Sequence, residues 1–300
     1  MTITRRASML TAMSWFAPLA GAQTSTLQNM PGEVVLRGDW PDAARIEAHR
    51  WVARSARVVT AYLGRFPAPQ AVITLVAADG AGIRSGLTFD GPPVGIRVAV
   101  GHDTSPAQFL DDWVMVHEMV HLAVSQMPRR HSWFHEGAAT YVEIIARARA
   151  GLTSREAAWD QLVRNLRHGL PLPGEGGMDG TRRWGRTYWG GALFFLQADL
   201  EIRGRTAERL GLQDALAGLV RAGSHYGEQW PIERTLATAD RAVGTPALSA
   251  LYARVKDEAV PVDLAALFRD LGLDRGNGAV RLLPDAPLAA ARRAILPETG

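Results

Sequence analysis

The sequence contains no cysteine. This absence excludes disulfide bonds and thiolate-ligated metals, so any metal site in this chain must use histidine, aspartate and glutamate side chains. Lysine is almost absent as well, because Lys256 is the single lysine and the other basic residues are arginines. We interpret this bias as genome composition rather than as a sign of function.

Two further absences exclude classes of partner. The chain has no Lys/Arg-rich run with interleaved aromatic residues, and its formal net charge is only +3, so it has no signature of nucleic-acid binding. Beyond residue 22 it also lacks a run of about 18 apolar residues, so we expect no membrane span. The hydrophobic fraction of 47% is nevertheless enough to supply a sizeable core.

Residues 1–22 have the layout of a signal peptide. Arg5 and Arg6 give the charged start, residues 7–20 form a short apolar stretch, and residues 20–22 read AGA, a small-x-small cleavage site. The arginine pair matches a twin-arginine signal only loosely. We therefore expect an exported protein, periplasmic or secreted. The alternative is an ordinary N-terminus, either disordered or buried.

Strand patterns come early in the chain and helix patterns late. The apolar, β-branched run at 71–77 and the alternating run at 94–100 predict strands, and the glycine- and proline-rich residues 79–93 predict a loop. Periodic apolar residues and capping signals predict helices. These helices span residues 41–64, 106–125, 133–149, about 153–167 (opened by a capping box at Thr153 and Glu156), 188–203, 212–222, 231–243, 247–259 and 263–271.

This order predicts an α+β fold with a small N-terminal sheet and a mostly helical C-terminal half. We expect an α/β subdomain at 33–150, a helical subdomain at 151–283 and a poorly packed tail at 284–300, which carries three prolines. A cleft between the two halves would be the natural place for a substrate.

Residues 117–121 read HEMVH, an HExxH motif. On a helix, His117 and His121 lie one turn apart on the same side, so both imidazoles can approach one ion. Glu118 is displaced by about 100° around the axis and can act on a water molecule without binding the metal. The flanking residues are apolar and predict a buried helix. The alternative is a buried helix whose two histidines bind no metal.

Residues 133–141 read WFHEGAATY. Together with HEMVH, this segment resembles the gluzincin peptidases of the peptidase MA-like superfamily, in particular the aminopeptidase N-like family. The resemblance implies a zincin-like domain, a Zn²⁺ ion and Glu136 as the third ligand. Two histidines and one carboxylate leave the fourth position open, as catalytic zinc requires.

Two neighbours of Glu136 need separate interpretation. Glu143 follows seven residues later on the same helix face, where it would either orient a ligand histidine or be a plain surface glutamate. His135 is adjacent to Glu136 but points elsewhere on a helix, so we predict that it is a neighbour of the site and not a ligand.

Residues 187–203 carry a second resemblance, to the glycyl aminopeptidase family. There, a Tyr-x-x-Gly-x-Leu helix ends in Leu-Asp-Leu-x-Ile-Arg, and Ala198 replaces the first of these leucines here. The resemblance implies that Tyr188 faces the zinc and stabilises the oxyanion. The alternatives are that Tyr188 is a core residue, or that His225 is the oxyanion donor.

The chain also departs from these families. Only fourteen residues separate His121 from Glu136, fewer than in the aminopeptidase N-like family. A Gly-x-Met-Glu-Asn exopeptidase motif is missing. Residues 91–101, in the place of the strand that lines the substrate, contain no glutamate to bind a free α-amine. Aminopeptidase activity is therefore in doubt.

Together these patterns predict a zinc-dependent metallopeptidase that hydrolyses peptide bonds of a peptide or protein substrate through a metal-activated water. In this hypothesis Glu118 is the general base and Tyr188 the oxyanion donor. Two alternatives stay open: a catalytically silent zinc-binding protein of the same fold, and a zinc hydrolase that acts on non-peptide amides.

Overall fold

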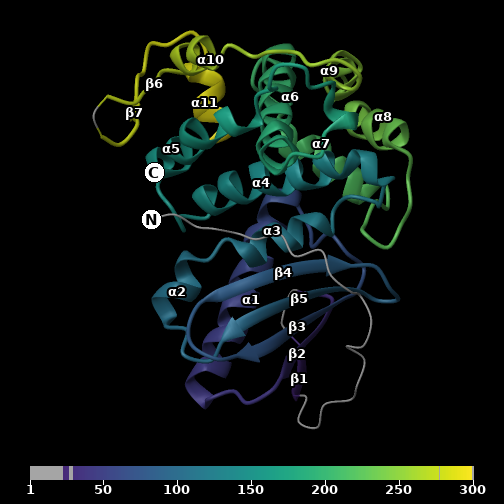
Figure 1. The fold of residues 1–300 in the computed structure, drawn as a ribbon, viewed down its shortest axis with the longest axis vertical. Coiled ribbons are helices and arrows are strands. Elements are labelled where there is room, and N and C mark those ends of the chain that lie inside the picture. Colours follow the sequence, from purple (N-terminus) through teal and green to yellow (C-terminus); the bar gives the residue numbers. More distant parts are fainter. Residues whose placement is uncertain (1–22, 27–29, 277, 299–300) are drawn as a thin grey trace.

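The computed structural model describes residues 23–26, 30–276 and 278–298. The predicted signal peptide lies outside the described residues. Five strands form one sheet in the order β1-β2-β3-β5-β4, in the lower part of Figure 1. Their bounds are β1 (Gln23–Thr26), β2 (Gly32–Arg37), β3 (Ala71–Ala78), β4 (Ile83–Phe89) and β5 (Val94–Gly101).

The centre of the sheet is parallel and both of its edges are antiparallel. β2, β3 and β5 run parallel, whereas β1 and β4 run antiparallel to their neighbours. Helix α1 (Asp42–Leu63) makes the crossover from β2 to β3 that a parallel pair requires. The predictions of a helix at 41–64 and of strands at 71–77 and 94–100 are confirmed.

The prediction of a loop at 79–93 is wrong, because this segment contains β4. The strand sits at the edge of the sheet and pairs only with β5, and Thr88 is its one buried residue. Such a strand lacks the apolar alternation that identifies a half-buried strand in a sequence. It is also β4, and not residues 91–101, that lines the cavity beside the metal-motif helix.

The predicted helix at 106–125 is two helices, α2 (Pro106–Asp111) and α3 (Val114–His121). The break falls at Asp112, which has an extended backbone with ψ of 141°. Its carboxylate accepts hydrogen bonds from Met115 N (3.1 Å) and Trp51 Nε1 (3.0 Å). Aspartate competes for helix amides in this way, so the chain turns at Asp112 and the helix restarts.

Helix α4 (Ser132–Arg149) confirms the helix predicted at 133–149. In Figure 1, α3 lies between the sheet and α4, with the later helices of the chain beyond α4, whereas α1 and α2 lie beside the sheet. The next helix is capped by Ser154, not Thr153. The remaining helices and a short hairpin are α5 (Arg155–Asn165), α6 (Gly191–Thr206), α7 (Leu212–Arg221), α8 (Ile232–Val243), α9 (Ala247–Val255), α10 (Leu264–Leu271), β6 (Leu273–Asp274), β7 (Arg281–Leu282) and α11 (Ala289–Ile295).

The last helix corrects the expectation of a poorly packed tail at 284–300. Ile295 is fully buried, and its carbonyl accepts a hydrogen bond from Arg149 Nε on α4 (2.8 Å). The α+β fold class is confirmed. The division near residue 150 stays a prediction. Among the described residues, no helix is both long and apolar enough to cross a lipid bilayer.

Candidate metal centre

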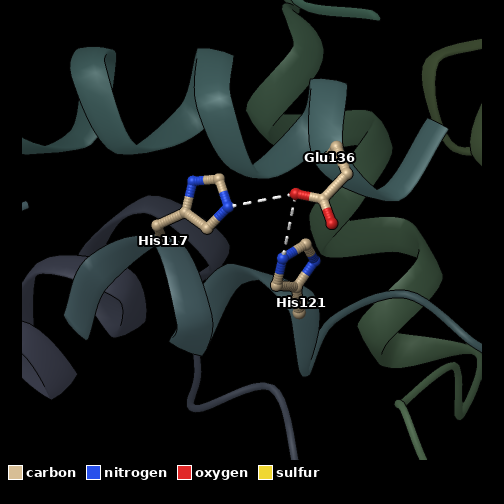
Figure 2. Close-up of side chains that lie close together, drawn as sticks. All are labelled: His117, His121 and Glu136. Carbon is tan, nitrogen blue, oxygen red and sulfur yellow. Dashed lines mark hydrogen bonds and ion pairs between the residues drawn. The ribbon is translucent and has the colours of Figure 1, made fainter. Parts of the chain in front are cut away.

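Three side chains from two helices converge where α3 packs against α4 (Figure 2). His117 Nε2 lies 3.3 Å and His121 Nε2 lies 3.6 Å from the same oxygen of Glu136, Oε2. One donor atom from each residue lies within 4.8 Å of the other two. Two imidazole nitrogens and one carboxylate oxygen are the donor set of a catalytic zinc site with an open fourth position. These residues therefore fit a zinc ion.

The charges of the ligands suit a cation. Burial lowers the pKa of His121 to about 3, so its imidazole is neutral near pH 7 and offers a lone pair. Burial raises the pKa of Glu136, but the hydrogen bond from His117, the charges of both histidines and the hydrogen bond from Tyr188 outweigh it and bring that pKa to about 2. Glu136 is therefore an anion at neutral pH.

The pKa of His117 is shifted in the opposite direction to that of His121. Burial lowers its pKa, but the hydrogen bond to Glu136 and the charges of Glu136, Glu118 and Glu143 prevail, so the pKa of His117 is raised. The imidazole thus keeps a proton against the carboxylate of Glu136. Metal ligands must be deprotonated, so a cation bound here would displace that proton.

Glu118 lies in the same cavity, which has a volume of about 310 Å³ and is bounded by β4, α3 and α4. Its side chain is buried, and burial raises its pKa. Thr88 Oγ1 donates a hydrogen bond to Glu118 Oε2 (2.8 Å). The predicted base is thus beside the ligands without being one of them.

Tyr188 reaches the site from a π-helical turn, Arg186–Gly190, which leads into α6. Its ring stacks against that of His117, with centroids 6.2 Å apart and an interplanar angle of 14°, and its hydroxyl hydrogen-bonds the Glu136 side chain. Single π-turns inside helices are frequent at functional sites. The alternative of a plain core tyrosine does not describe this position.

Two glycines place Tyr188 beside Glu136. A Cβ atom on Gly191 would lie 2.3 Å from the Trp133 carbonyl oxygen, and one on Gly137 would lie 2.3 Å from the Gly191 carbonyl carbon. The backbones of α4 and α6 therefore touch at a point where only glycine fits. Gly137 directly follows Glu136, the predicted glutamate ligand, so this contact sets the distance between the two elements at the site.

Glu143 is buried, with 2% of its surface exposed, so it is not a plain surface glutamate. It forms an ion pair with Arg147 at 3.7 Å, and burial raises its pKa to about 7. Among the described residues, His117 Nδ1 and Glu143 Oε2 are buried without a hydrogen-bond partner. A role for Glu143 in orienting His117 stays a prediction, because no hydrogen bond joins them.

His225, the alternative oxyanion donor, does not line the cavity that holds Glu118. His225 lines a separate surface groove beside Arg65 and Phe66, and its Nδ1 accepts a hydrogen bond from Gly227 N (3.1 Å). Its neighbour Tyr226 lines the metal cavity instead. Sequence reasoning missed Tyr226, because no motif surrounds it and its place depends on how the loop after α7 folds back onto α3.

His135 is not one of the three converging side chains, and its exclusion as a ligand stays a prediction. It does not point away from the site, however. Its ring is 6.2 Å from that of His121 and packs edge-on against Tyr226 at 5.9 Å. Burial lowers the pKa of His135 to about 4, so it is a neutral side chain of the cavity wall.

No protein-family model and no curated protein sequence matches the chain. Solved structures do. An aminopeptidase N family protein from Idiomarina loihiensis matches with a TM-score of 0.59 and 13% identity, over 84% of this chain and 49% of that one. A mutant of the M1 zinc metallopeptidase from Deinococcus radiodurans matches with a TM-score of 0.51 and 17% identity, over 81% of this chain and 53% of that one. Native yeast LTA4 hydrolase matches with a TM-score of 0.54 and 12% identity, over 83% of this chain and 42% of that one.

The chain spans roughly half the length of each of these proteins. At such low identity the likeness concerns the fold, and the site described above rests on this chain's own residues. The chain has the fold of the gluzincin metallopeptidases that these aminopeptidase N family and LTA4 hydrolase structures represent.

Proposed function

We propose that this protein is a zinc-dependent metallopeptidase that hydrolyses peptide bonds. The observation that carries the proposal is the position of Glu118, a buried carboxylate that shares one cavity with three converging metal ligands. His117, His121 and Glu136 would hold the ion. A zinc ion bound there acts as a Lewis acid on a carbonyl group and on water.

The chain's own residues supply the remaining steps of the reaction. Glu118 accepts the proton of the attacking water and delivers it to the leaving amine, which turns one side chain into both base and acid. The hydroxyl of Tyr188 donates a hydrogen bond to the oxyanion that develops on the carbonyl oxygen. The edge strand β4 forms one wall of the cavity.

A catalytically silent zinc-binding protein is the first rival. It would have no use for Glu118, because burying a carboxylate that does not bind the metal costs free energy. A hydrolase of non-peptide amides is the second rival, and a panel of peptides and small amides separates it from a peptidase. Matched peptides with free and acetylated amino termini then distinguish aminopeptidase from endopeptidase activity.

Replacement of the base tests the proposal. Glu118→Gln should bind zinc as the wild type does and lose turnover by about 10²–10⁴-fold, the usual contribution of general acid–base catalysis. Zinc content by elemental analysis and peptide hydrolysis by mass spectrometry measure the two effects. The exposed Glu233→Gln on α8 is the matched control and should behave as wild type. Full turnover in a zinc-loaded Glu118→Gln variant would refute the proposal.

We also propose that the protein is exported. The support is the charged, apolar and small-residue pattern of residues 1–22. Expression of the full chain in a Gram-negative host, followed by mass spectrometry of the periplasmic protein, should find an N-terminus at Gln23. Intact protein confined to the cytoplasm would contradict it.

A further inference from the structure

Thr88 touches the proposed base at two points. Its hydroxyl lies 2.8 Å from Glu118 Oε2 and 3.0 Å from the Glu118 carbonyl oxygen. Thr88 is 6% exposed, so water does not compete for these contacts. The hydroxyl has one proton to donate, and both of its acceptors belong to the same residue. Either hydrogen bond connects β4 to Glu118.

The contact with the carbonyl follows from where α3 ends. The last four carbonyls of a helix have no partner within it, and Glu118 is one of these four because α3 ends at His121. The amide of Leu122 bonds to the Met119 carbonyl instead (3.2 Å). Thr88 therefore provides a hydrogen bond that the helix itself does not make.

Gly86 confines the other side of the carboxylate. It lies two residues before Thr88, so both point to the same face of β4. A Cβ atom at Gly86 would lie 2.6 Å from Glu118 Cγ and 2.6 Å from Oε1. The Glu118 side chain thus rests against the bare backbone of the edge strand, while its second oxygen is held by Thr88.

We propose that Thr88 is a positioning residue, which fixes the orientation of the Glu118 carboxylate for proton transfer, with Gly86 providing the space. The inference rests on the proposed function, since it assigns a task to the base of that reaction. A glutamate side chain loses rotamer freedom when it is held in this way. The hydrogen bond from Thr88 restricts the Glu118 side chain to one orientation before the substrate binds. Loss of this hydrogen bond should therefore lower kcat and leave KM nearly unchanged.

Three variants of the full-length, zinc-loaded protein test this inference. Thr88→Val keeps the shape of the side chain and removes the hydroxyl, and it should lower kcat by about 10- to 100-fold, as expected for the loss of a buried hydrogen bond to a charged group. Thr88→Ser keeps the hydroxyl and should recover most of the wild-type kcat. Thr74→Val, on β3 and separated from β4 by β5, is the control and should retain wild-type kcat.

Zinc content and thermal unfolding are measured on the same samples. Equal zinc content in all variants, with kcat lost only in Thr88→Val, supports the inference. A wild-type kcat in Thr88→Val, loss of zinc together with activity, or failure of Thr88→Ser to restore turnover would overturn it. Absence of wild-type turnover on every substrate would instead refute the proposed function itself.

Gly86→Ala should also lower kcat with zinc retained, and full activity in this variant would contradict the confinement of Glu118.

Discussion

At the scale of single residues, the cavity holds two phenols with different surroundings. Tyr188 hydrogen-bonds Glu136 and stacks on His117, whereas Tyr226 packs against His135. Burial raises the pKa of Tyr226, and the charges of Asp90, Glu136 and Glu118 add to that effect, so the Tyr226 hydroxyl keeps its proton at neutral pH. Of these two phenols, Tyr188 is the one that hydrogen-bonds Glu136, so we predict that Tyr188, and not Tyr226, donates to the oxyanion.

Tyr188→Phe should therefore lower kcat by about 10²–10³-fold, the usual cost of removing one oxyanion donor, with zinc content unchanged. Steady-state kinetics on a peptide that the wild type cleaves measures the effect. Tyr226→Phe is the matched control, because it removes a second hydroxyl from the same cavity. If Tyr226→Phe loses turnover and Tyr188→Phe keeps it, the assignment of Tyr188 is wrong.

At the scale of elements, the site depends on how closely α4 and α6 approach. The contact between Gly137 and Gly191 leaves no room for a methyl group on either side. Gly204 lies on the same helix α6, and a Cβ atom there would meet nothing within 4 Å. Alanine substitutions at Gly191 and Gly204 therefore distinguish the effect of the close helix contact on stability from the general effect of replacing a glycine in a helix.

Gly191→Ala should destabilise the protein by about 1–3 kcal/mol, as overpacking does, and should lower kcat because Tyr188 moves away from Glu136. Gly204→Ala should raise the stability by about 0.4–1 kcal/mol, since alanine has less conformational entropy to lose on folding. Urea unfolding measures both. Equal effects of the two substitutions would show that the close contact has no energetic consequence.

At the scale of the whole molecule, a buried polar network joins three helices. Asp199 on α6 accepts hydrogen bonds from Tyr141 on α4 (2.8 Å), from Arg203 on its own helix (2.9 Å) and from Leu212 N at the start of α7 (2.9 Å). Asp199 has no exposed surface and Arg203 is 2% exposed. The network connects the helix that carries Glu136 to the helical half of the chain.

Asp199→Ala should cost about 3–5 kcal/mol of unfolding free energy, because it leaves the Arg203 guanidinium buried without its partner. Glu201→Ala removes a half-buried carboxylate with the same i,i+4 spacing to an arginine, the exposed Arg205, and should cost less than about 1 kcal/mol. Chemical denaturation measures both. A small effect at Asp199 would mean that the three helices are held together by apolar packing alone.

Zinc should stabilise the whole fold, because its ligands come from two different helices. Binding at about 1,000 times the dissociation constant adds about 4 kcal/mol, so a chelator should lower the Tm of the wild type by several degrees. His121→Ala should abolish this difference between zinc-loaded and chelated protein, and His225→Ala, outside the cavity, should preserve it. The same chelator effect in both variants would contradict the ligand assignment.

Much of the chemistry could be predicted from the sequence, because it depends on local spacing. Helix geometry alone places His117 and His121 on one face, and the long helices α1 and α4 follow from their apolar periodicity. Glu136 could be assigned as a ligand because its motif resembles that of the gluzincins. Strand β4 and the break at Asp112 could not be predicted, since an edge strand has little apolar pattern and the break depends on Trp51, 61 positions away in the chain.

The sequence by itself determined that His117 and His121 share one helix face with Glu118 beside them, since residues three or four positions apart on a helix need no tertiary information to become neighbours. The packing of α3 against α4 then brought Glu136 to both histidines. Only the tertiary structure decided which tyrosine faces the ligands, that Glu143 is buried, and that Thr88 holds Glu118. Each of these depends on contacts between segments far apart in the chain, such as Thr88 with Glu118 and Gly137 with Gly191. Such contacts are fixed by packing, which no local pattern encodes.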